Sequence, residues 1–199
     1  MISIGLTGNV GSGKTSVAGI WKKERGAVLI DADQIGRAVV QPGSRCLTRL
    51  VQRFGEEILL PDGSLNRRIM AVMAFSDREN LEALNSIVHP EIIRKINDQL
   101  QEARSQGAEA VVVDAALIFE FGFECCLDVV VAVDAPSEIK IGRMLTKGKI
   151  NRETLEKILD AQLPADELKA KADHVLDNSA DEESLKKRAL ELFDRLVSK

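Results

Sequence analysis

Five short runs of apolar, mostly β-branched residues constrain the fold of this 199-residue chain more than any other feature. The runs are apolar throughout rather than alternating, so both faces of each predicted strand should be buried, as in a parallel sheet covered by helices. Helical patterns separate the runs, which predicts an α/β fold built from βα units. The predicted strands span residues 2–8, 27–33, 110–115, 129–135 and 174–178.

Small or acidic residues stand at or just beyond the ends of these runs. Open α/β sheets place their ligands at the carboxyl ends of parallel strands. These residues should therefore point towards one edge of the sheet, although not all of them can be catalytic. They are Gly8, Asp31, Asp33, Asp114, Asp134 and Asp177.

Two regions interrupt the alternation of strands and helices. Residues 36–108 are too long for one crossover helix and predict several helices, with a turn at residues 61–64. Residues 140–172 are charged and helical, with breaks expected at residues 147–149 and at Pro164. Both regions are interpreted as insertions over the ligand-binding edge. The final helix should pack through an apolar stripe of Leu185, Ala189, Leu192 and Leu196.

The composition excludes several classes of protein. No stretch is apolar for long enough to span a membrane, and the formal net charge of −4 argues against a broad basic surface for nucleic acid. The first residues show no basic segment with a cleavage site, so we expect no secretory signal. The 3 cysteines include no C-x-x-C pair and the histidines number only 2, so a zinc site is not expected. We expect a cytoplasmic protein with reduced thiols.

Residues 8–15 read Gly-x-x-x-x-Gly-Lys-Thr, between a predicted strand and a predicted helix. This is the pattern and the context of a phosphate-binding loop, whose backbone N–H groups converge on phosphate oxygens. Lys14 would reach the β- and γ-phosphates of a nucleoside triphosphate, and the Thr15 hydroxyl would bind Mg²⁺. The expected nucleotide-binding residues of this loop are Gly8, Asn9, Val10, Gly11, Ser12, Gly13, Lys14, Thr15 and Ser16.

The second predicted strand offers a candidate general base. A carboxylate near the γ-phosphate can accept the proton of an attacking hydroxyl. Asp31 and Asp33 would turn the same way while the strand continues, so either could be the base, or both could cap the strand end. Asp114 has the position of a carboxylate that holds Mg²⁺ through water, but a plain strand-end carboxylate fits equally well.

Residues 140–152 supply the positive charge that a transferring phosphoryl group needs. Arg143 and Lys147 are four residues apart and share a predicted helix face, and Arg143 is the best candidate for a lid residue. The remaining basic residues are interpreted as a solvated face. They are Lys140, Lys149 and Arg152.

Motifs along almost the whole chain resemble the dephospho-CoA kinase family. Many enzymes share a phosphate-binding loop, but the combination of D-A-D-x-I-x-R at residues 31–37 with L-N-x-I-V-H-P at residues 84–90 is far more specific. A G-x-L-x-R element ends at Arg67. Further matches are LIFE at residues 117–120, Gln162, Ala172, Asp173 and Asn178.

The resemblance implies that the γ-phosphate of ATP, with Mg²⁺, passes to the ribose 3′-hydroxyl of dephospho-CoA. This reaction is the last step of coenzyme A biosynthesis. Asp33 would be the general base, Lys14 and Arg143 would act on the phosphate, and Asn178 would help to bind ATP. The acceptor-binding residues would be Asp33, Arg37, Arg67, His89 and Glu120. For His89, the residues alone favour a histidine that caps or packs at a helix start before Pro90.

The resemblance also implies one P-loop kinase domain over residues 1–199, with a P-loop NTPase fold. The core would comprise about residues 1–35, 109–139 and 173–199, with a helical acceptor-binding insertion at about 36–108 and a lid at about 140–165. The chain would act as a monomer or weak homo-oligomer, without nucleic acid or membrane. Three residues depart from the family pattern: Ala116 in place of a proline, Lys147 in place of an arginine, and Gly148 in place of an acid. Lysine keeps the charge but lacks the guanidinium fork.

Two other functions remain open from the residues. One is a nucleoside or nucleotide kinase of related fold. The other is a regulatory P-loop ATPase that binds a partner protein through its helical insertion. Vigorous turnover with a small acceptor and no partner would exclude the second.

Overall fold

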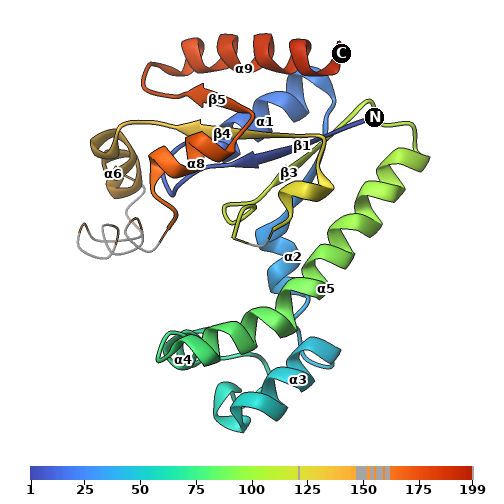
Figure 1. Cartoon of the computed structure of the whole chain (residues 1–199), viewed down its shortest axis with the longest axis vertical. Coiled ribbons are helices and arrows are strands. Elements are labelled where there is room, and N and C mark those ends of the chain that lie inside the picture. The colour runs from blue at the N-terminus through green and yellow to red at the C-terminus, as the bar shows by residue number, and fades with distance from the viewer. Residues whose placement is uncertain (121, 147–151, 153–154, 156–158, 160–161, 199) are drawn as a thin grey trace. The chain divides into compact units, whose positions relative to one another are not determined.

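The computed structural model describes residues 1–120, 122–146, 152, 155, 159 and 162–198. Within these residues five strands form one parallel sheet in the order β2-β3-β1-β4-β5 (Figure 1). The predicted α/β class and the five-stranded parallel sheet are confirmed. The strands are β1 (Ile2–Thr7), β2 (Val28–Asp31), β3 (Ala110–Asp114), β4 (Val129–Asp134) and β5 (His174–Asp177).

The chain divides into two compact units, residues 1–31 with 100–199 and residues 32–99. The helices of the first unit are α1 (Lys14–Arg25), η2 (Glu124–Cys126), α6 (Ser137–Thr146), α8 (Ala165–Lys171) and α9 (Glu182–Val197). Those of the second are α2 (Ala32–Ala38), α3 (Arg45–Phe54), η1 (Glu56–Ile58), α4 (Arg67–Ala74) and most of α5 (Arg78–Ser105). No helix in the described part of the chain has the length and apolarity that crossing a bilayer demands.

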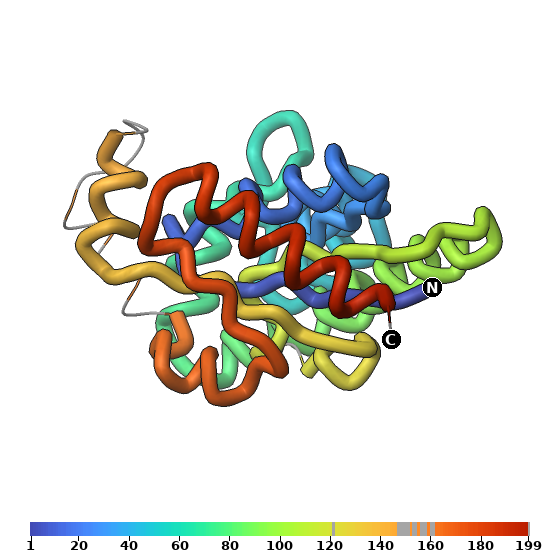
Figure 2. Tube along the Cα trace, turned by 90° about the horizontal axis from the view of Figure 1, so that it is seen from above, coloured from blue at the N-terminus to red at the C-terminus, as the bar shows by residue number. Residues whose placement is uncertain are grey.

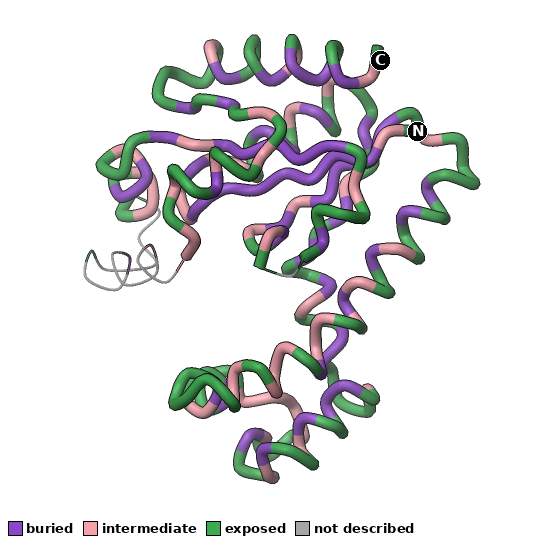
Figure 3. The backbone as a smooth tube through the Cα atoms, in the orientation of Figure 1, coloured by how far each residue is buried: buried purple, intermediate pink, exposed green. Residues whose placement is uncertain are grey.

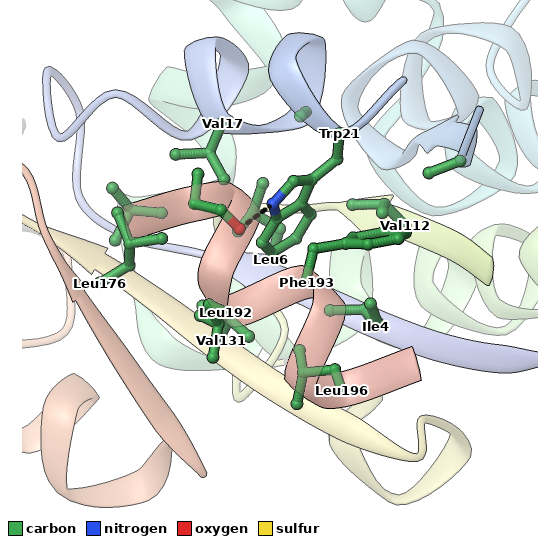
Figure 4. Close-up of a cluster of buried hydrophobic side chains, with 14 of the residues drawn as sticks. Ile4, Leu6, Val17, Trp21, Val112, Val131, Leu176, Leu192, Phe193 and Leu196 are labelled. Atoms are coloured by element: carbon green, nitrogen blue, oxygen red, sulfur yellow. Dashed lines mark hydrogen bonds between the residues drawn. The ribbon is translucent and has the colours of Figure 1, made fainter. Parts of the chain in front are cut away.

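Helices α1 and α9 lie side by side on one face of the sheet, whereas α8 packs against β4 on the other (Figure 1, Figure 2). The ring of Trp21 is fully buried between α1 and α9, 5.6 Å from the ring of Phe193 (Figure 4). Its Nε1–H donates to the Ala189 carbonyl at 2.8 Å. The predicted apolar stripe of α9 is buried as expected. These contacts fix α1, and with it the loop that precedes it, against the sheet.

The second unit has a small apolar interior of its own (Figure 3). Helix α3 begins at its N-cap Ser44, whose side chain accepts a hydrogen bond from the N–H of Leu47. The predicted turn at residues 61–64 is present, closed by the N–H of Gly63 on the Leu60 carbonyl at 2.9 Å. Side chains from α3, η1 and α4 fill the interior: Cys46, Leu47, Leu50, Phe54, Ile58, Met70 and Ala74.

Two local predictions are wrong. The second strand ends at Asp31 and α2 begins at Ala32, so Asp33 lies in the first turn of a helix and not on a strand. An aspartate is favoured there by the helix dipole. Helix α5 continues through Pro90, so His89 lies inside a helix rather than at its start. Proline removes one backbone donor from α5, and tertiary packing, with Ile87 and Ile92 buried on either side, overrides that cost.

We expect Trp21→Phe to lower the free energy of unfolding by about 2–3 kcal/mol, because it removes the bond to Ala189 and leaves a cavity. Chemical denaturation followed by far-UV circular dichroism measures this, since Trp21 is the chain's 1 tryptophan. The control Phe75→Leu, at a side chain that is 74% exposed, should change stability by less than about 0.5 kcal/mol. Equal losses in the two variants would contradict the packing role of Trp21.

Candidate active site

The loop between β1 and α1 presents an open helix start to solvent. Gly13 precedes α1 in the left-handed conformation and makes no side-chain cap, and the first turn of the helix carries no acidic residue. The first N–H groups of α1 and the positive end of its dipole are therefore available to an anion. The Lys14 side chain folds back over the loop, where its Nζ donates to the Gly8 carbonyl at 2.7 Å. The arrangement is that of a phosphate-binding loop.

Glycine is required in this loop because other backbone segments approach it closely. A Cβ on Gly8 would stand 2.3 Å from the Val133 carbonyl oxygen, and one on Gly11 would stand 2.6 Å from the Lys140 carbonyl oxygen. Gly11 also has a φ of +79°, which side-chain-bearing residues rarely adopt. The carboxyl end of β4, at Val133, and the first turn of α6, at Lys140, thus lie directly against the loop.

A cavity of about 1160 Å³ opens beside the loop within the first unit. It brings together most of the predicted nucleotide-binding residues, but Gly8 and Ser12 do not line it. The predicted residues that line it are Asn9, Val10, Gly11, Gly13, Lys14, Thr15, Ser16, Arg143 and Asn178. Sequence reasoning missed the wall beyond them: Gly19, Ile20, Lys23 and Glu24 of α1, and Glu182, Leu185 and Lys186 of α9. The helical spacing of Ser16, Gly19, Ile20 and Lys23 was a usable signal, since residues three and four apart share a face.

Arg143 of α6 lines this cavity, and one nitrogen of its guanidinium, Nη1, is without a partner among the described residues. Its Nη2 donates to the Asn178 carbonyl at 2.9 Å and to Asn178 Oδ1 at 3.2 Å. Its Nη1 is buried and has no hydrogen-bond partner among the described residues. A buried donor without a partner costs about 1–3 kcal/mol, so this nitrogen is suited to an acceptor on a bound ligand. Ser12 Oγ, inside the loop, is also buried and has no hydrogen-bond partner among the described residues.

The interpretation of Lys140 as part of a solvated basic face is wrong. Lys140 is only 3% exposed, and its Nζ lies 3.0 Å from Asp134 Oδ1. Helix α6 begins at Ser137, directly after β4, so its first turn brings Lys140 back over the end of the strand. Lys169 Nζ lies 3.5 Å from the other Asp134 oxygen, and the Asp134 carbonyl accepts from the N–H of Asn178 at 2.7 Å. Asp134 thereby ties α6, α8 and the end of β5 together.

The other basic residues of this region divide into two groups. Arg152 is exposed as predicted and lies 3.2 Å from Glu138 Oε1. Lys147, Gly148 and Lys149 lie outside the described residues. Ala116 is described, and its carbonyl accepts a hydrogen bond from Thr7 Oγ1 at 3.2 Å.

The carboxylates at the strand ends are close neighbours. Asp31 on β2 and Asp114 on β3 are in register, and Asp114 is in register with Leu6 on β1. Registered residues on adjacent strands project to the same face of a sheet. Glu120 is exposed in the loop after β3 and does not line the cavity.

The remaining predicted acceptor-side residues belong to the second unit. Asp33 and Arg37 are exposed and lie four residues apart on α2, so they share one face of that helix. Arg67 is the exposed first residue of α4. His89, half-buried in α5, has a pKa below its ordinary value because burial disfavours the charged imidazolium. His89 is therefore neutral at pH 7.

We expect Gly11→Ala to lower the affinity for ATP at least about tenfold, because the loop must move away from the Lys140 carbonyl. It should also cost about 1–3 kcal/mol of stability for the strained backbone. Nucleotide titration and thermal unfolding measure the two effects. Gly19→Ala is the matched stability control, since its Cβ would meet nothing within 4 Å on a helix, and it should stabilise the protein by up to about 1 kcal/mol. A Gly11 variant with wild-type affinity would contradict this account of the loop.

The lowered pKa of His89 should make the free energy of unfolding decrease as the pH falls below neutral. Because its folded pKa is lowered, the unfolded chain binds more protons below about pH 6.5, so stability falls as the pH drops from there to the folded pKa. Between pH 7.5 and 5.5, the wild type should therefore lose more unfolding free energy than His89→Gln. Urea denaturation at the two pH values measures the difference. Identical losses would show that His89 is not desolvated.

Comparison with known proteins shows the family to which the chain belongs. A family model described as dephospho-CoA kinase matches residues 2–184. The dephospho-CoA kinase of Corynebacterium diphtheriae is 38% identical over 98% of this chain and 97% of the relative. That of Corynebacterium efficiens is 40% identical over 100% of this chain and 96% of the relative.

Solved structures extend the comparison to the fold. TT1252 from Thermus thermophilus has a TM-score of 0.84 and 32% identity, covering 98% of this chain and 96% of that one. Shikimate kinase from Bacteroides thetaiotaomicron shares the fold, with a TM-score of 0.56 at 13% identity and 98% coverage of both chains. The resemblance inferred from the sequence motifs is confirmed by the family model and the relatives. This chain belongs to the dephospho-CoA kinase family.

Proposed function

We propose that this chain transfers the γ-phosphate of ATP to the ribose 3′-hydroxyl of dephospho-CoA, the final step of coenzyme A biosynthesis. The observation that carries the proposal is the cavity of the first unit, which is lined by an uncapped helix start, Lys14 and Arg143, whose buried Nη1 has no hydrogen-bond partner among the described residues. Such a space suits a polyphosphate, and membership of the dephospho-CoA kinase family supports the choice of acceptor.

In this proposal the loop from Gly8 to Ser16 binds ATP together with Arg143 and Asn178. Lys14 releases the Gly8 carbonyl and donates to the β- and γ-phosphates. Arg143 is held in place by its two bonds to Asn178, so its free Nη1 meets charge on the transferring group without reorganisation. Positioning and charge neutralisation supply most of the acceleration, as in other phosphoryl transfers.

Asp33 is the proposed general base, which accepts the proton of the attacking 3′-hydroxyl. Its place in the D-A-D-x-I-x-R motif favours it over Asp31, and its exposed position on α2 leaves the carboxylate accessible. Arg37 and Arg67 suit the pyrophosphate of the acceptor, because guanidinium groups bind such oxygens in bidentate fashion. Neutral His89 and Glu120 complete the proposed acceptor-binding set.

The donor set fits Mg²⁺ as the cofactor. The described residues contain no group of three or more candidate side-chain metal ligands. Mg²⁺ in kinases needs only one or two protein ligands, since phosphate oxygens and water supply the rest. The exposed Thr15 hydroxyl in the cavity would hold the ion, with Asp31 or Asp114 acting through water. Bound Mg²⁺ would neutralise charge on the β- and γ-phosphates.

We also propose which segments of the chain bind the acceptor and which cover the nucleotide. Residues 36–108 would form the acceptor-binding insertion, and residues 140–165 a lid over the nucleotide. The protein would work as a monomer or weak homo-oligomer in the cytoplasm, where its 3 free cysteines stay reduced.

ADP release with Mg²⁺-ATP tests the reaction and its base together. Turnover should be strong with dephospho-CoA and weak with AMP, a deoxynucleoside or no acceptor. Asp33→Asn should lower kcat at least about 100-fold, because the amide cannot accept the proton. The control Asp98→Asn, an exposed carboxylate in the same unit, should keep wild-type kcat.

Three outcomes would count against the proposal. Equal slow ADP release with every acceptor would mean that the chain is a P-loop ATPase of another kind. A better turnover with a nucleoside would assign it to a different kinase reaction. Loss of turnover in Asp31→Asn but not in Asp33→Asn would move the base to the other carboxylate.

A further inference from the structure

The outer turn of the phosphate-binding loop is fastened to a segment more than 150 residues away in the sequence. The side-chain amide of Asn9 donates to the Leu163 carbonyl at 3.0 Å, across 154 residues. The backbone N–H of Val10 donates to Gln162 Oε1 at 2.9 Å, across 152 residues. The two bonds join neighbouring residues of the loop to neighbouring residues of the other segment. They therefore fix the orientation of the loop as well as its distance from residues 162–163.

The next two loop residues are held in a different way. Gly11 rests against the backbone of Lys140, and the Ser12 carbonyl accepts from Asn178 Nδ2 at 2.7 Å. Both contacts depend on buried groups that also hold the sheet and α6 together. The bond from Val10 to Gln162, by contrast, uses one neutral, half-buried side chain. It can be removed without disturbing the buried groups.

We propose that Gln162 is a positioning residue for the phosphate-binding loop. Gln162 does not line the cavity, so it acts through Val10. Its oxygen holds the peptide plane between Asn9 and Val10, and because peptide units are rigid, this restricts the planes that follow. The N–H groups of the following residues are the ones that a phosphate meets. The choice of ATP as the ligand rests on the proposed function.

The alternative is that Gln162 only fills space. A Gln162→Met variant separates the two roles, because methionine keeps the length of the side chain but has no comparable acceptor. Calorimetric titration with ATP and with ADP, without any acceptor substrate, should show affinity lowered about 3- to 10-fold, the loss of one hydrogen bond. The KM for ATP should rise while the KM for dephospho-CoA stays at the wild-type value, and the melting temperature should fall by only about 2–4 °C for the lost hydrogen bond. The matched control is Gln106→Met at an exposed glutamine, which should change none of these.

A second readout uses the protein without nucleotide. Amide hydrogen exchange at Val10 should be faster in Gln162→Met than in the wild type, because the N–H has lost its acceptor. Gln162→Glu keeps an acceptor oxygen of the same reach and should restore the protection of Val10. Hydrogen exchange of the two variants is compared without nucleotide, so the negative charge of the new glutamate has no phosphate to repel.

Wild-type affinity for ATP in Gln162→Met would overturn the proposal, as would unchanged exchange at Val10. Equal loss of protection in the methionine and glutamate variants would overturn the role of the acceptor oxygen. The titrations contain nucleotide but no acceptor, so their result does not depend on which acceptor the chain phosphorylates. A wild type that binds ATP but does not phosphorylate dephospho-CoA would count against the proposed function and leave the result for Gln162 intact.

Discussion

The part-buried ion pair between Asp134 and Lys140 is the interaction on which the floor of the nucleotide site depends. It holds the first turn of α6 over the end of β4, and the Lys140 carbonyl then supports the loop at Gly11. The backbone of Asp134 meanwhile accepts from Asn178, which orients Arg143. Removing either partner of the pair would leave a charge without its partner, at Lys140 in a buried position. One residue at a strand end thus supports the loop through its carboxylate and Arg143 through its backbone carbonyl.

The predictable parts of the molecule are those that local pattern determines. Unbroken apolar runs identified all five strands. The three central strands β1, β3 and β4 are buried along almost their whole length as expected, but the edge strands expose Val28 on β2 and Val175 on β5. The phosphate-binding loop followed from glycine spacing and from its place between a strand and a helix. The stripe on α9 followed from helical periodicity.

The parts that sequence reasoning missed depend on three-dimensional geometry. Lys140 looked like one basic residue among several, and only the sharp turn between β4 and α6 brings it to Asp134. Asp33 was placed on a strand because the apolar run continued past Asp31, but β2 pairs with β3 only as far as Asp31. The pattern before Pro90 predicts a helix start there, whereas buried side chains on both sides of Pro90 keep α5 continuous. The roles of Asp33, Arg37, Arg67, His89 and Glu120 stay predictions.

The contacts of the loop also have a consequence for the order of events during synthesis. Residues 8–15 are synthesised some 150 residues before Gln162, Leu163 and Asn178, their partners in the folded loop. Long-range contacts of this kind form late, because a large chain closure must precede them. A nascent chain that ends before Gln162 therefore carries the glycine-rich sequence without the partners that hold the loop at Asn9, Val10 and Ser12. The full set of loop contacts can form only once β5, which Asn178 directly follows, has been synthesised.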